Sequence, residues 1–244
     1  MGIVVTVTSG KGGTGKTSIT GGVAASLALM GRRVLCIDMD IGLRNLDISL
    51  GLSDRALMDF SDVALGRCPL SRAAVEHPTI KGLFLLTAPM FLPSDLTTDR
   101  VRALLNTARA AYDYILIDSP AGLGAGFRLA TCDADRVLVI ATTDASSLRD
   151  AQRTVEELDH IRNIHLIMNR IQVKLLRRLR ATIDDAMNAA GLPLVGVVPE
   201  DPQVILCANL GLPITSRGKR GAALACWNIA LRLEGHRVPI MRIR

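Results

Sequence analysis

Aromatic side chains are scarce in this sequence, because Phe, Tyr and Trp together make up 3% of its 244 residues. Proteins that hold single-stranded nucleic acid without sequence preference stack the bases on aromatic rings. The chain has too few rings for such a platform, so this class of protein is excluded.

Paired cysteines and long apolar runs are also missing. The five cysteines include no C-x-x-C pair, and they are Cys36, Cys68, Cys132, Cys207 and Cys226. This spacing argues against a disulfide framework or a zinc site, and it favours a reducing cytoplasm with small buried thiols. No apolar run approaches the roughly 18–20 residues of a membrane-spanning helix, and the first residues lack the basic region of a secretory signal. We therefore expect a cytoplasmic protein.

The formal charge of +6 is concentrated at one end of the chain. Residues 215–244 contain seven Lys and Arg side chains and one acidic residue, Glu234, so the rest of the chain sums to zero. Such a segment could attract DNA or acidic lipid, or it could form a solvated helix face. A second basic cluster, interpreted as a solvated helix start, consists of Lys174, Arg177, Arg178 and Arg180.

Apolar, β-rich runs alternate with helical patterns along the chain. The runs occupy 3–9, 33–38, 82–88, 114–119, 136–142, 164–169 and 193–199, and helices are expected over 15–30, 97–111, 146–160 and 175–190. Runs without polar alternation are typical of strands buried on both faces. The pattern predicts an α/β fold with a doubly wound, mostly parallel sheet of about seven to eight strands and helices on both faces. No linker or repeat interrupts it, so residues 1–244 are expected to form one domain.

The stretch "GKGGTGKT" fits the phosphate-binding pattern G-x-x-x-x-G-K-[ST] between a predicted strand and a predicted helix. In such a loop the backbone N–H groups face phosphate oxygens, the final lysine reaches the β- and γ-phosphates, and the hydroxyl binds Mg²⁺. The sequence therefore predicts a P-loop NTPase fold, with Lys16 as the phosphate lysine and Thr17 as a metal ligand. Lys11 is a second lysine inside the loop, where the pattern requires none.

Acidic residues follow two of the predicted strands. Asp38 and Asp40 come at the end of one, and Asp118 follows the apolar run "YILI". A nucleoside triphosphate site needs carboxylates to hold Mg²⁺ and to position water. Because ligands of doubly wound sheets bind at the carboxyl ends of the strands, these three residues are candidates for that task.

The segment "KGGTGKT" resembles the deviant Walker A motif of the MinD/ParA family of ATPases. The segments "DMDIGLRNLDISLGL" (38–52) and "IDSPAGLGAGF" (117–127) resemble the two switch regions of the division-site members of that family. Further likeness at 146–153, 167–171, 196–214 and 227–241 extends it along the whole chain. The resemblance implies ATP rather than GTP as the nucleotide, and the sequence shows no clear N-K-x-D guanine motif.

The resemblance also implies residue roles. Lys11 would be the signature lysine, which each subunit of an ATP-bridged homodimer contributes to its partner's phosphates. Asp38 and Asp118 would hold Mg²⁺ with Thr17, and Asp40 would orient the attacking water. The phosphates would be bound by Gly10, Lys11, Gly12, Gly13, Thr14, Gly15, Lys16, Thr17 and Ser18, and the adenine framed by Asn169, Arg170, Pro199 and Glu200.

The implied function is that of a Mg²⁺-dependent ATPase, slow without an activating partner, that acts as a dimerisation switch in bacterial division-site placement. A regulator of the MinC or MinE kind is the expected protein partner. The alternatives are a ParA-like partition ATPase that binds DNA non-specifically and a flagellar-number regulator. Only "IMRIR" follows Pro239, which is too short for the basic amphipathic helix that usually ends the division-site members. Membrane association is therefore doubtful for the chain as given, and a peripheral location at the inner face of the plasma membrane stays the alternative to a purely cytoplasmic one.

Overall fold

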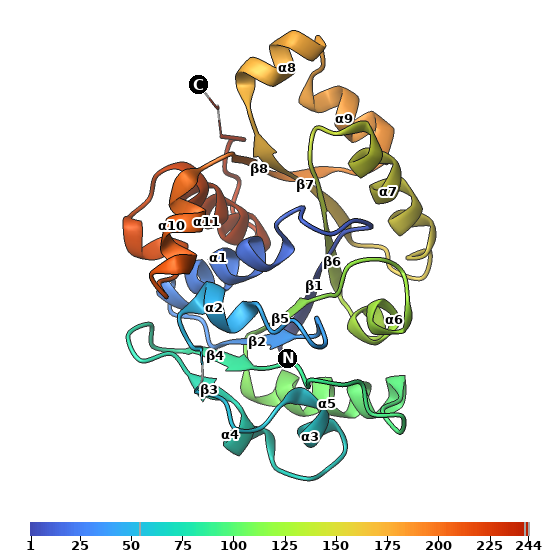
Figure 1. Ribbon diagram of the computed structural model, residues 1–244, viewed down its shortest axis with the longest axis vertical. Coiled ribbons are helices and arrows are strands. Elements are labelled where there is room, and N and C mark those ends of the chain that lie inside the picture. The colour runs from blue at the N-terminus through green and yellow to red at the C-terminus, as the bar shows by residue number, and fades with distance from the viewer. Residues whose placement is uncertain (54, 242, 244) are drawn as a thin grey trace.

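A single eight-stranded sheet forms the centre of the computed structural model, which describes residues 1–53, 55–241 and 243 (Figure 1). The strand order is β3-β4-β2-β5-β1-β6-β7-β8, and every neighbouring pair is parallel except β3 with β4. The strands are β1 (Ile3–Thr8), β2 (Val34–Asp38), β3 (Val75–Glu76), β4 (Leu83–Leu86), β5 (Tyr114–Asp118), β6 (Arg136–Ala141), β7 (Ile164–Ile171) and β8 (Leu194–Pro199). The predicted fold class is confirmed, and the short antiparallel β3 is an addition that the sequence pattern did not indicate.

Helices cover both faces of the sheet (Figure 1). Successive residues of a strand point to opposite faces, so Val5 and Val7 of β1 pack in one core layer and Val4 in another. The helices are α1 (Lys16–Leu29), α2 (Leu46–Leu50), α3 (Phe60–Ala64), α4 (Leu70–Ala73), α5 (Thr98–Ala111), α6 (Ala125–Thr131), α7 (Ala145–Glu156), α8 (Val173–Leu179), α9 (Ile183–Ala190), α10 (Pro202–Asn209), α11 (Gly221–Leu233) and a 3-10 turn at Ile214–Arg217. The core layer that contains Val5 and Val7 also includes residues of α1 and α11. The layer that contains Val4 includes residues of α5, and a third cluster includes residues of α7 and α9.

The prediction of one helix over 175–190 is wrong, because the segment forms two helices, α8 and α9. Arg180 ends α8 in the left-handed region, with φ of 51°. Thr182 then starts α9 with a capping box, in which its hydroxyl accepts from the Asp185 amide and the Asp185 carboxylate accepts from the Thr182 amide. Leu179, the last residue of α8, is 54% exposed.

The remaining expectations concern membrane-spanning helices, the basic C-terminal segment and the number of domains. None of the helices in the described residues is long and apolar enough to cross a membrane. Arg242 and Arg244 of the basic C-terminal segment lie outside the described residues. Whether residues 1–244 form one domain stays a prediction.

Candidate nucleotide site

The phosphate-binding loop connects β1 to α1 at the carboxyl edge of the sheet. Gly13 and Gly15 have φ of 76° and 93°, values that side chains with a Cβ rarely adopt. No side chain in the described part of the chain caps α1, and its first turn contains no acidic residue. The amides of that turn are therefore available to an anion, as a phosphate site requires.

Gly15 also allows Asn169 to approach the loop. A Cβ at Gly15 would lie 2.3 Å from the Asn169 amide nitrogen, which donates to the Thr14 carbonyl oxygen at 2.7 Å. This contact joins the loop to the end of β7, and it brings two parts of the predicted site together.

Lys16 lies inside the loop with 7% of its surface exposed. Its ammonium is 3.1 Å from the hydroxyl of Ser9, which also accepts from Thr14 and donates to the Lys11 carbonyl. Burial lowers the pKa of Lys16, while the negative charges of Asp118 and Asp40 oppose this shift. Ser9 immediately precedes the motif, and no role was predicted for it from the sequence.

Asp38 and Asp118 face each other at the ends of β2 and β5, where they are paired in register and each 1% exposed. Burial raises the pKa of Asp118 to about 8, and the neighbouring Asp38 adds to the shift. Burial likewise raises the pKa of Asp38 to about 6, although the amides of Asp40 and Leu46 donate to it at 2.9 and 3.1 Å. The positive charge of Lys16 opposes the shift at Asp118, but burial of the two adjacent carboxyl groups outweighs it.

The donor set around these carboxyl groups fits Mg²⁺. Asp118 Oδ2 is buried and has no hydrogen-bond partner in the described residues, while the Thr17 side chain hydrogen-bonds to the same carboxyl group. Mg²⁺ takes hard oxygen ligands, commonly one or two carboxylates together with substrate phosphates and water. The predicted ligands Thr17, Asp38 and Asp118 are therefore brought together beside the phosphate lysine.

Replacing Asp118 by Asn is expected to stabilise the nucleotide-free protein at pH 8 by about 1–3 kcal/mol. Because the pKa of Asp118 rises from 3.8 to about 8 on folding, the folded state binds more protons than the unfolded state between these values. The free energy of unfolding contributed by this group is therefore highest below about pH 4 and falls as the pH rises toward 8. Urea unfolding of both proteins at pH 5 and pH 8 measures the difference.

Asp99→Asn is the matched control, because the Asp99 side chain is 86% exposed. We expect Asp99→Asn to leave the difference in the free energy of unfolding between pH 5 and pH 8 the same as in the wild type. If the Asp118→Asn variant is no more stable than the wild type at pH 8, burial of the Asp118 charge does not destabilise the nucleotide-free protein.

Asp40 lies on the turn that follows β2 and is half-buried. Its carbonyl accepts from the amides of Leu43 and Arg44 at 3.2 and 3.4 Å, which closes the turn. Burial raises the pKa of Asp40, and the positive charge of Lys16 opposes the shift. The carboxyl group thus lies at the same strand edge as the predicted metal ligands, where a water beside the phosphates would be found.

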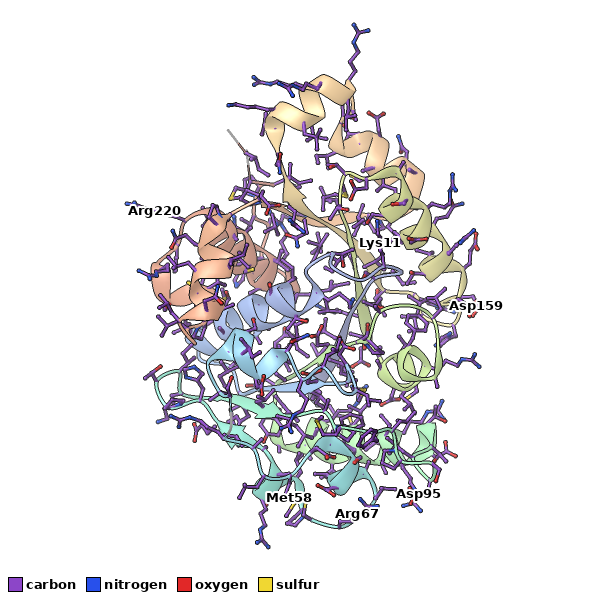
Figure 2. All side chains as sticks on the ribbon, in the orientation of Figure 1. Lys11, Met58, Arg67, Asp95, Asp159 and Arg220 are labelled. Carbon is purple, nitrogen blue, oxygen red and sulfur yellow. The ribbon has the colours of Figure 1, made fainter. Side chains whose placement is uncertain are left out.

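Lys11 differs from Lys16 in its surroundings. It is exposed, and its ammonium is 3.0 Å from the hydroxyl of Ser146 at the start of α7 (Figure 2). The structure therefore separates the two lysines of the loop: Lys16 faces Asp118 and Asp40, and Lys11 extends toward α7. Gly12 is exposed on the same loop, and Gly10 packs against Asp150 of α7.

A cavity of about 240 Å³ adjoins the loop. Its lining includes all four residues predicted to frame the base, Asn169, Arg170, Pro199 and Glu200, together with Gly13, Gly15 and Ser18 of the loop. Arg170 has φ of 56°, and its guanidinium forms an ion pair with Glu200 at 2.8 Å and donates to the Gly13 carbonyl. A hydrogen bond therefore connects the polar side of the cavity to the phosphate-binding loop.

Several residues that line this cavity were not predicted from the sequence. They are mostly apolar: Ile19, Val198, Asp201, Val204, Ile205, Ile214, Ala222 and Cys226. The stretch 196–214 was identified only as one of the segments that resemble the family. Helix α10 and the 3-10 turn within it were not predicted, so its apolar residues could not be assigned to one wall of a cavity. An apolar wall beside a few polar groups suits a flat heterocycle.

The fold and the loop define a P-loop nucleotide-binding protein with a second lysine in its phosphate loop. Residues 5–214 match the family described as the CobQ/CobB/MinD/ParA nucleotide binding domain. The chain is 40% identical to the septum site-determining protein MinD of Helicobacter pylori over 100% of this chain and 95% of that protein. It is 36% identical to MinD of Bacillus subtilis over 98% and 92% of the two. The chain belongs to the MinD/ParA family, in its MinD branch.

Solved structures agree with this grouping. MinD in the MinC:MinD cell division protein complex of Aquifex aeolicus superimposes with a TM-score of 0.88 at 37% identity and covers 98% of both chains. MinD of Pyrococcus horikoshii, complexed with Mg-ADP, has a TM-score of 0.84 at 26% identity over 96% of both chains.

Proposed function

We propose that this chain is a Mg²⁺-dependent ATPase that acts as an ATP-dimerisation switch in bacterial division-site placement. The observation that carries the proposal is the separation of the two loop lysines in a protein that resembles MinD along its whole length. A lysine that extends away from its own phosphate site can serve the site of a second subunit. Hydrolysis would then depend on pairing.

Each residue of the site has a task in this reaction. The loop amides and Lys16 bind the β- and γ-phosphates, and Asn169, Arg170, Pro199 and Glu200 surround the base. Thr17, Asp38 and Asp118 would hold Mg²⁺, which would neutralise charge on the phosphates. The Asp40 carboxylate orients the attacking water and accepts its proton, and Lys11 of the second subunit stabilises the negative charge of the transferring group.

The division-site role is favoured over partition by the identity of the relatives. MinD of Helicobacter pylori and MinD of Bacillus subtilis match at 40% and 36% identity, whereas a ParA family ATPase of Chlorobium tepidum matches at 22%, a level that supports the fold alone. The MinD of Aquifex aeolicus forms a complex with MinC, so a MinC-like protein is the partner that we propose for this chain. We place the protein in the cytoplasm.

The proposal predicts a nucleotide-dependent change of mass. With Mg²⁺ and a non-hydrolysable ATP analogue, the protein should elute from size exclusion with light-scattering detection at about twice its monomer mass. With Mg²⁺ and ADP it should remain a monomer. A chain that stays monomeric with the analogue at saturating concentration would overturn the switch.

The same experiment separates the two roles. A MinC-like protein should co-elute with the analogue-bound dimer only. A partition ATPase would instead bind arbitrary duplex DNA in an ATP-dependent manner, with an affinity that falls steeply as salt rises. DNA binding of that kind without binding of the MinC-like protein would favour the partition role.

A further inference from the structure

An apolar groove that the nucleotide site does not use lies beside α8. It has a volume of about 540 Å³, and its lining comes from β7, β8, α8, α9 and the C-terminal segment. The helices and the C-terminal segment contribute Val173 and Leu176 of α8, Ile183 and Met187 of α9, and Ile240 and Met241. Asp184 is the only charged residue among the described residues that line it.

The helix at the rim of this groove is strongly basic. In α8 and its C-cap, Lys174, Arg177, Arg178 and Arg180 are all exposed. None of the four forms an ion pair within residues 1–53, 55–241 and 243. The basic cluster therefore extends through the whole of α8, where the sequence analysis expected a solvated helix start.

The surroundings of the cations are apolar as well. α8 has no buried residue, and two of its leucines, Leu175 and Leu179, are 38% and 54% exposed. The helix lies at the top of the view, and nitrogen-tipped side chains extend from it away from the body of the molecule (Figures 1 and 2). A helix that existed only to be solvated would need neither an apolar groove beside it nor exposed leucines on its surface.

We propose that this groove is a docking site for an acidic amphipathic segment of a partner protein. The apolar side chains of the segment would enter the groove, and its Asp and Glu residues would face the four cations of α8. This is the usual arrangement when a helix binds in a groove, with charge complementarity at the rim. An acidic partner matches the charge of the site, since the cations form no ion pairs with the described residues of this chain.

Concavity favours a peptide over the other anionic partners. A lipid surface is flat, so it would contact Leu175 and Leu179 but leave the groove walls unfilled. Duplex DNA would pair with the cations through its phosphates and would gain nothing from an apolar floor. The inference rests on the groove and its charges alone, and it does not depend on the proposed ATPase switch.

The test uses the full chain and a defined probe. The probe is a fluorescent peptide of about 20 residues designed as an amphipathic helix, with leucines on one face and glutamates on the other, and its binding is followed by anisotropy. We expect Arg177→Glu with Arg178→Glu to weaken binding by about tenfold or more, because both rim charges are reversed. Ile240→Glu, which places a charge in the groove wall, should weaken binding about as much.

The matched control is Lys81→Glu with Arg100→Glu, which makes the same change of net charge at two exposed cations elsewhere. It should alter peptide affinity by less than about twofold. All variants should keep the melting temperature and the basal ATP hydrolysis of the wild type, so a change in binding cannot reflect misfolding or a failed switch.

Two outcomes would overturn the proposal. One is a peptide affinity that is equal in the wild type and in the Arg177 and Arg178 variant. The other is no binding of the peptide while vesicles of phosphatidylcholine and phosphatidylglycerol, or a DNA duplex of about 30 base pairs, bind the wild type but not the variant. The second outcome would assign the cations to lipid or to nucleic acid.

Discussion

Replacing Lys11 by Ala is expected to abolish ATP-dependent dimerisation and to lower partner-stimulated hydrolysis by at least about 100-fold. A cation supplied by a second subunit to a phosphoryl transfer site typically accelerates the reaction about 10³- to 10⁵-fold. Lys11 is exposed and bonded to Ser146, whereas Lys16 already faces the carboxylates of its own site. Removing Lys11 should therefore leave the affinity of the monomer for a fluorescent ATP analogue within about threefold of the wild type.

Lys16→Ala provides the contrast, because loss of the buried lysine should remove nucleotide binding itself. The two variants together distinguish a lysine that acts across an interface from one that acts within the chain. Size exclusion with a non-hydrolysable analogue, followed by phosphate release with and without the partner, measures both effects. If Lys11→Ala dimerises and hydrolyses ATP normally, the role that we propose for Lys11 is wrong.

The phosphate loop and its carboxylates could be predicted from the sequence because their geometry is local or follows from parallel strands. Four fixed residues define the loop, and Asp38 and Asp118 each end an apolar strand. Parallel strands place their carboxyl ends at one edge, so residues 80 positions apart in the chain become register partners. The class of fold followed from the same alternation of strands and helices.

The base cavity and the α8 region could not be predicted in the same way. Val204, Ile205 and Cys226 meet only because α10 and α11 pack near the end of β8, which is a long-range arrangement. In the segment 175–190, the helical pattern of the sequence indicated one helix, whereas the structure has two, and the second begins with the capping box at Thr182 and Asp185. A local hydrogen-bond pattern thus outweighed periodicity, and it left Leu179 exposed.

Ser9 shows a third limit of sequence reasoning. It precedes the phosphate-binding pattern and has no fixed place in it, yet its hydroxyl contacts Lys16, Thr14 and the Lys11 carbonyl. These contacts link both lysines to the same side chain. The sequence pattern does not indicate these contacts, because they form only when the folded loop brings the three groups to one hydroxyl.

Replacing Asp40 by Ala is expected to slow ATP hydrolysis by about 10²- to 10⁴-fold while ATP still brings two chains together. The Asp40 carboxylate is not among the groups that hold the metal in our assignment, since Asp38 and Asp118 are opposite each other in the sheet and Asp40 lies on the turn beyond them. Its removal also takes a negative charge away from the phosphate site, so nucleotide affinity should stay the same or rise. Single-turnover hydrolysis and size exclusion with ATP itself measure the two effects.

Asp40→Asn tests whether the loss is chemical or structural. Asn keeps the size of the side chain but cannot accept the proton of the attacking water, so it should hydrolyse ATP as slowly as the Ala variant and dimerise as well. Both variants should retain the backbone contact in which the residue 40 amide donates to Asp38, because that bond does not involve the side chain of residue 40. If either variant hydrolyses ATP at the wild-type rate, Asp40 does not handle the attacking water. If neither dimerises with ATP, the carboxylate serves the interface between subunits rather than the chemistry.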